Sequence, residues 1–179
     1  MLLSDRPKLA RADARRILAA AAGDPVDHAT AALWLLVGMH PLDVERLKIA
    51  DWPAEGERRR LRAGPLENPR LITIAPSAAT ALDVLASLGG ASPLVPGMTV
   101  IRQMVLMRDL AEQIGQKVSA LDLRRAAIDE VLEDGTPVAH AAWYFGASKA
   151  KVRGLPMPHA GYDLAIAQVL QRAFVSASE

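Results

Sequence analysis

The chain has 179 residues, of which 51% are hydrophobic and only 4% aromatic, so it can bury a core built mainly of aliphatic side chains. It holds no cysteine, which excludes disulfide bonds, thiolate metal sites and a thiol nucleophile. The formal net charge of +1 differs from the strong basic excess of dedicated duplex-binding proteins, so charge alone does not indicate DNA.

We expect a single soluble, cytoplasmic domain over residues 1–179, since this length fits one domain better than two. No apolar run reaches the roughly 20 residues that a membrane-spanning helix needs. The N-terminal residues are basic, and no apolar segment long enough for a secretion signal follows them.

Residues 7–22 predict a short amphipathic helix with Leu9, Ile17 and Leu18 as its apolar anchors and a stop at 23–25. We interpret the arginines of this helix as a solvated face. Contact with phosphate is the alternative interpretation.

Residues 27–37 and the segment after Pro41 predict two helices that break at Gly38, with Pro41 as the first residue of the second helix. His40 lies in the connection between them. We interpret His40 as a corner residue whose ring is satisfied by a backbone carbonyl.

The helical period disappears between Trp52 and Pro76. Two short runs there, 58–62 and 70–74, have strand character, and a turn-rich segment separates them, which predicts a β-hairpin. The first run is rich in arginine. These side chains suit contact with a DNA backbone, and they equally suit an edge strand that is charged against aggregation. They are Arg58, Arg59, Arg60 and Arg62.

Two further amphipathic helices are predicted near 76–88 and 99–114. Ser119 and Asp122 then have capping-box spacing, which places Arg124 in the first turn of the next helix. Arg124, with Arg125 beside it, either binds phosphate or pairs with a carboxylate such as Asp122 or Glu130.

The end of this helix is marked by Gly135, which suits a left-handed stop. Thr136 is predicted to cap the following helix, and Pro137 is predicted to be its first residue. Beyond that helix, the basic side chains of Lys149, Lys151 and Arg153 suit a phosphate contact, and they equally suit a solvated turn.

Residues 162–174 predict a final helix with an apolar stripe. The stripe either folds back on the chain's own core or docks on a second copy of the chain as a homo-oligomer. Its members are Leu164, Ile166, Val169, Leu170 and Phe174.

Two of these stretches resemble the tyrosine recombinases, the phage-integrase family. The first runs from Leu33 to Trp52, as an apolar helix, a glycine and a leucine-rich helix that ends in aspartate. The second is the Asp-Leu-Arg-Arg helix and its successor, from Ser119 to Ala147. The resemblance covers about residues 9–153. It implies a mainly α fold with a small antiparallel β-sheet, like the family's catalytic domain, without the family's separate N-terminal domain.

The resemblance also assigns positions to the family's catalytic residues. The family's first arginine falls on His40, its histidine on Leu121, its second arginine on Arg124, and its later histidine or tryptophan on Ala147. Arg124 is thus the one of these four residues that matches. A guanidinium binds two phosphate oxygens at once, whereas an imidazole offers at most one donor, so His40 is a poor substitute.

Two other family residues have no counterpart. The family's hairpin lysine is missing, because no lysine occurs between Lys48 and Lys117. The nucleophilic tyrosine would fall near 155–157, where no tyrosine stands, and Tyr162 follows farther on. Because the residues of such a site act as a unit, we expect the chain to be catalytically inactive.

We therefore expect a recombinase-like protein that binds DNA weakly or modulates a partner recombinase. The alternatives are an active recombinase with Tyr162 as a displaced nucleophile, and a helical protein-interaction module without DNA. We expect no cofactor and no metal, since the four histidines show no metal-ligand spacing. The candidate phosphate-binding residues are Arg124, Arg125, Arg58, Arg59, Arg60, Arg62, Lys149, Lys151 and Arg153.

Overall fold

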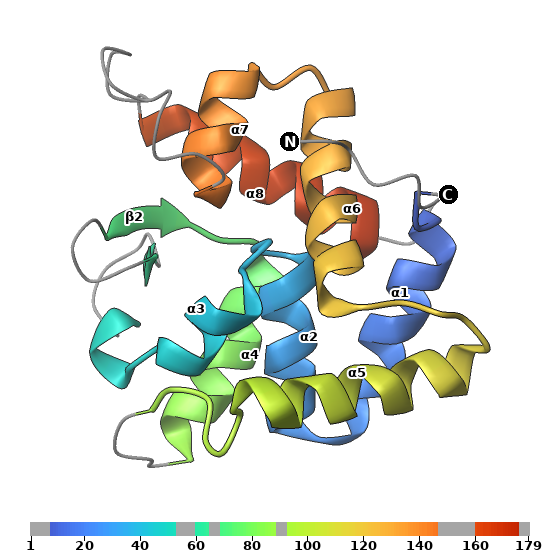
Figure 1. The fold of residues 1–179 in the computed structure, drawn as a ribbon. Helices are drawn as coiled ribbons and strands as arrows, with labels where there is room; N and C mark the ends of the chain where they lie inside the picture. Colours follow the sequence, from blue (N-terminus) through green and yellow to red (C-terminus); the bar gives the residue numbers. More distant parts are fainter. Residues whose placement is uncertain (1–7, 53–59, 65–68, 89–92, 147–159, 176–179) are drawn as a thin grey trace.

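A computed structural model describes residues 8–52, 60–64, 69–88, 93–146 and 160–175 (Figure 1). These residues form helices and one antiparallel pair of strands, which confirms the predicted mainly α fold with a small sheet. No helix among them is long and apolar enough to cross a membrane. The elements are α1 (Arg11–Ala20), η1 (Ala21–Gly23), α2 (Pro25–Leu35), α3 (Pro41–Arg46), η2 (Ile49–Asp51), β1 (Arg60–Ala63), β2 (Arg70–Thr73), α4 (Pro76–Ser87), α5 (Val100–Ile114), α6 (Ala120–Glu133), α7 (Val138–Phe145) and α8 (Ala160–Phe174).

Helix α2 lies near the middle of the molecule, with α5 crossing one of its ends (Figure 1). Its residues from Ala29 to Leu35 are all buried, because α1, α4 and α6 pack around it. A helix that is apolar on every side is expected to be enclosed in this way. The buried indole of Trp34 donates to Gln103 Oε1 on α5 (3.1 Å), so even its polar atom has a partner inside the core.

The start of α6 is the predicted capping box. The Ser119 amide donates to Asp122 Oδ2 (2.9 Å), and the Asp122 amide donates to Ser119 Oγ (3.3 Å). The predicted start of α7 is wrong by one residue, since Pro137 precedes the helix with an extended ψ of 135° and α7 begins at Val138. The reason is that the Thr136 amide still donates to Val131 O (3.2 Å) in the closing turn of α6, after the left-handed Gly135 (φ 91°).

The predicted hairpin is confirmed, with Arg60 opposite Thr73 and Ala63 opposite Arg70. Leu61 and Ile72 face the core, so Arg70 lies on the inner face of the sheet with them. Arg60 and Arg62 lie on the outer face.

Helix α8 folds back on α6, α1 and β2, as one of the two alternatives predicts. Its stripe is buried at Ile166, Val169, Leu170 and Phe174, but Leu164 is 42% exposed. The predicted place of Leu164 in the stripe is therefore wrong. The buried position at this end of α8 belongs to Asp163, which accepts from both the amide and the hydroxyl of Thr73 in β2 (2.8 and 2.7 Å).

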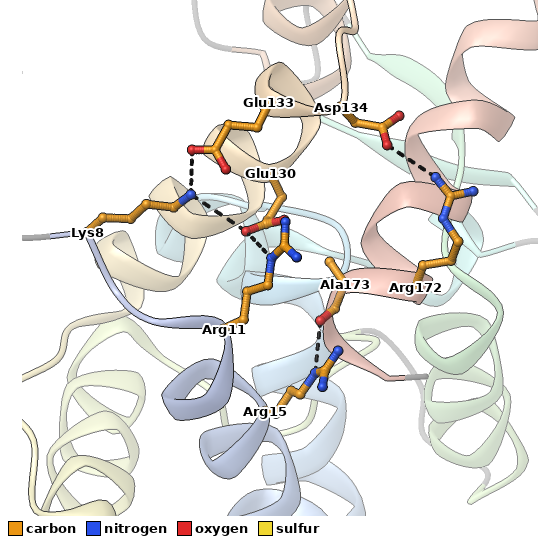
Figure 2. A network of polar contacts seen from close by, with 8 residues as sticks. All are labelled: Lys8, Arg11, Arg15, Glu130, Glu133, Asp134, Arg172 and Ala173. Carbon is orange, nitrogen blue, oxygen red and sulfur yellow. Dashed lines mark hydrogen bonds and ion pairs between the residues drawn. The ribbon is translucent and has the colours of Figure 1, made fainter. Parts of the chain in front are cut away.

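Basic residues before and within α1 hold it to the C-terminal half of the chain (Figure 2). Lys8 Nζ contacts Glu133 (2.6 Å), and Arg11 Nη2 contacts Glu130 (2.6 Å), whose side chain is only 3% exposed. Arg15 Nε donates to the Ala173 carbonyl on α8 (2.9 Å). The Arg11 side chain is 59% exposed, as the interpretation of a solvated face predicts, and Arg15 is half-buried; both also have partners within the fold.

Candidate phosphate-binding site

The guanidinium of Arg124 joins two chain segments that are distant in sequence. Its Nη1 donates to the Gly38 carbonyl after α2, and its Nη2 donates to the Phe145 carbonyl at the end of α7 (2.7 Å). The predicted alternative in which Arg124 pairs with Asp122 or Glu130 is wrong. Asp122 caps its own helix, and Glu130 binds Arg11.

Two left-handed glycines allow this arrangement. Gly38 (φ 66°) turns its carbonyl toward Arg124, and a Cβ added to it would overlap the ring of Phe145. Gly146 (φ 64°) follows α7, and a Cβ added there would overlap the guanidinium of Arg70. Gly38 is therefore needed for conformation and for space, whereas Gly146 is needed for its left-handed conformation, because the end of the Arg70 side chain could move aside.

Arg70 is the residue that sequence reasoning missed. It reaches from the inner face of the hairpin across Gly146, close enough to Arg124 for its charge to act there. Burial lowers the pKa of Arg124, and the neighbouring Arg70 lowers it further, while Asp43 of α3 opposes both effects. Burial also lowers the pKa of Arg70, against the attraction of Asp43. The alternation of Arg70 with Ile72 along the strand was the available signal for its inward position.

Arg70 Nε is a buried donor that has no hydrogen-bond partner among the residues that the structure describes. Asp43 influences both guanidiniums, but it forms no ion pair with either of them within the same residues. The site therefore contains two positive charges and one more distant negative charge.

The other sequence candidates lie apart from this pair. Arg62 is exposed and Arg60 is half-buried on the outer face of the hairpin, and Arg125 forms an ion pair with Asp129 (3.8 Å). Leu121 is 51% exposed on α6. The remaining candidates, Arg58, Arg59, Ala147, Lys149, Lys151 and Arg153, lie outside the described residues.

His40 occupies the corner between α2 and α3 as predicted, but its predicted carbonyl partner is wrong. Its Nδ1 accepts from the Leu42 amide (3.2 Å) and so caps α3. Because Nδ1 is the acceptor, the ring proton of neutral His40 is on Nε2. An N-terminal helix end provides amide donors, which explains why the partner is an amide.

The two tyrosines differ in exposure, since Tyr144 is buried in the core and Tyr162 is 36% exposed. Tyr144 is completely buried, and its hydroxyl donates to the Thr73 carbonyl (3.0 Å). Burial raises the pKa of Tyr144 above its ordinary value of 10.0. The ring of Tyr162 stacks on His140 with a centroid distance of 3.7 Å.

The raised pKa of Tyr144 predicts a loss of stability in alkali. The stabilising effect of its neutral form is complete below pH 10.0, the pKa expected in the unfolded chain, and declines as the pH rises above it. One pH unit above that value, this group alone should cost about 1.4 kcal/mol. Urea unfolding of wild type and Tyr144→Phe across this range measures the effect, because lysine titration is common to both. Equal pH dependence in the two proteins would contradict the prediction.

No protein-family model and no curated protein matches the sequence. Similar solved structures are those of the XerA recombinase (20% identity, TM-score 0.68), a lambda integrase(75-356) dimer bound to a COC' core site (12%, 0.61) and the XerH site-specific recombinase bound to difH substrate (13%, 0.59). The similarity covers 94%, 88% and 96% of this chain, but only 65%, 63% and 52% of those chains. The chain therefore has the fold of the tyrosine-recombinase catalytic domain.

Proposed function

We propose that this chain is a catalytically inactive protein of the recombinase fold that binds duplex DNA through its phosphates. The observation that carries the proposal is the pair of half-buried guanidiniums, Arg124 and Arg70, which the carboxylate of Asp43 opposes at a distance. Arginine is well suited to phosphate because its planar fork matches two oxygens. Two of the similar solved structures are described as bound to a core site or a substrate, which supports DNA as the source of the phosphate.

We base the proposed inactivity on the tyrosine hydroxyls that could act as the nucleophile and on the family's catalytic positions. Strand exchange by this fold needs a nucleophile next to several donors around one phosphorus. The chain has two tyrosines, and the hydroxyl of Tyr144 is committed to a carbonyl in the core. Of the four family positions, Arg124 alone keeps the expected residue. The site can then hold a phosphate but lacks the group that would attack it.

Binding of this kind is expected to be weak and salt-dependent. Contacts to phosphate carry little sequence information, so we expect micromolar or weaker affinity with little sequence preference. Each neutralised phosphate contributes about 0.9 to the slope of log affinity against log salt, so one phosphate bound at this site predicts a loss of about threefold between about 50 and about 200 mM salt.

The test is a titration of short duplexes at these two salt concentrations, with wild type and Arg124→Ala. It is run beside an assay for covalent adducts on a nicked suicide duplex. We expect salt-dependent binding without any adduct. An adduct that disappears in Tyr162→Phe would establish the active recombinase instead. A failure to bind duplex at low salt would favour the protein-interaction module.

Contact with a second protein chain, such as a partner recombinase, is the second candidate. It is favoured by two apolar side chains that lie one turn apart on α5, Ile101 and Met104, which are 75% and 68% exposed. Sedimentation of the protein alone and with a recombinase of the same fold tests it. This candidate would be contradicted if the protein sediments as a monomer alone and if it does not sediment with the recombinase when the two are mixed.

A further inference from the structure

We infer that the guanidinium of Arg70 binds the phosphate at this site. Arg124 is a positioning residue, which fixes the backbone at Phe145 and Gly146 beneath Arg70. This inference rests on the proposed function and assigns its central contact to a residue of the hairpin. It follows from what each guanidinium already bonds, from the space around each one and from the charge of the cluster.

The hydrogen bonds differ between the two arginines. Arg124 directs one nitrogen at each of two carbonyls, of Gly38 and Phe145, which fixes the plane of its guanidinium. In the part of the chain that the structure describes, Arg70 makes no hydrogen bond and no ion pair, and its Nε is buried without a partner. Buried charged donors are normally satisfied, and a bound anion is a partner that would satisfy this one. Arg60 Nε on the outer face is also buried without a partner among the described residues, so the assignment to Arg70 rests as well on its position beside Arg124.

The two bonds of Arg124 also explain its positioning role. They secure the Phe145 carbonyl and thereby the chain at Gly146, over which the Arg70 guanidinium lies. Gly146 has no side chain, so the surface under Arg70 is bare backbone. Arg124 thus helps to position the Arg70 guanidinium indirectly, by fixing the backbone at the end of α7.

The charge of the cluster identifies the ligand. Among the described residues, two guanidiniums against the carboxylate of Asp43 leave one positive charge. A phosphodiester carries one negative charge and presents tetrahedral oxygens to a guanidinium fork, so it neutralises the cluster. Free phosphate offers the same chemistry and can serve as a probe.

The experiment compares Arg70→Met with Arg62→Met, which alters an exposed arginine of the same hairpin on its outer face. Thermal unfolding is recorded with increasing inorganic phosphate and, separately, with a short duplex at low salt. Without ligand, Arg70→Met should melt at or above the wild-type temperature, because it removes a half-buried charge whose Nε has no partner among the described residues. The rise in melting temperature with phosphate should occur in wild type and Arg62→Met, and it should be lost in Arg70→Met, with affinity at least about tenfold lower.

A second measurement covers the case in which Arg70→Met fails to fold. Arg70→Lys keeps the charge but loses the fork and the Nε donor, so it should fold and bind phosphate several-fold more weakly. In the wild type, the NMR signal of the Arg70 Nε–H should move when phosphate is added. The inference is overturned if this signal does not move, or if phosphate stabilises Arg70→Met or Arg70→Lys as much as it stabilises the wild type.

The two ligands separate this inference from the proposed function. If phosphate stabilises the protein through Arg70 but duplex does not bind, the inference holds and the proposed function fails. If duplex binds equally well to wild type and Arg70→Met, DNA binding stands and the assignment to Arg70 is wrong.

Discussion

Replacing Gly38 with alanine is expected to lower the free energy of unfolding by about 2 to 5 kcal/mol. Part of this cost is conformational, since Gly38 has a φ of 66° and a left-handed backbone costs an L-residue about 1 to 2 kcal/mol. The other part is steric, because the new Cβ would overlap the buried ring of Phe145 and overpacking costs about 1 to 3 kcal/mol. Domains have free energies of unfolding of only about 5 to 15 kcal/mol, so this one methyl group would remove a large part of the stability.

Denaturant unfolding monitored by circular dichroism measures this effect. Gly23→Ala is the matched control, because nothing lies within 4 Å of its added Cβ and its φ is not in the left-handed range. We expect the control to change the midpoint little. Similar stability of Gly38→Ala and wild type would mean that the turn after α2 rearranges at low cost, which would also weaken the role given to the Gly38 carbonyl.

Replacing Asp163 with leucine is expected to cost about 3 to 5 kcal/mol. The carboxylate is buried and accepts three hydrogen bonds, from the Thr73 amide, the Thr73 hydroxyl and the Leu164 amide. Bonds to a charged group are worth about 1.5 to 3 kcal/mol each, and leucine would leave the Thr73 donors unsatisfied inside the protein. The loss would separate α8 from the hairpin that carries Arg70.

A double-mutant cycle with Thr73→Val checks the mechanism. Both substitutions break the bond from the Thr73 hydroxyl to Asp163, whereas the bond from the Thr73 amide is lost only when Asp163 is replaced. Because one bond is shared, the double variant should be less destabilised than the sum of the single variants. The exposed Asp109 of α5, whose partner is the adjacent Arg108, provides the control, and Asp109→Leu should change stability by less than about 0.5 kcal/mol. Additive effects of Asp163→Leu and Thr73→Val would contradict the proposed contact.

Sequence reasoning succeeds for this protein where the signal is local. The capping pair Ser119 and Asp122, the helix-starting Pro41 and the break at Gly38 each act through bonds or torsions within a few residues. It fails where the deciding partner is distant. The acceptors of Arg124 lie 86 and 21 residues away and are backbone carbonyls, which no residue pattern indicates.

The candidate site shows the same division. The position of Arg124 follows from the capping pair of the helix that carries it, whereas the inward position of Arg70 depends on its alternation with Ile72 and on the pairing of the two strands. At α8, Asp163 takes the buried position in place of Leu164 because Thr73 offers it two donors. A carboxylate in a helix stripe is read as exposed unless its partner in another element is known.

The bond between Arg15 and the Ala173 carbonyl has a consequence for the order in which the chain folds during synthesis. It joins residues 158 positions apart, so every element between α1 and α8 must be made before it can form. At the usual rate of translation, the ribosome adds Ala173 about 8 to 30 s after Arg15. Helix α1 is therefore made well before its partner on α8, and the nascent chain stays open along that face until α8 has been made.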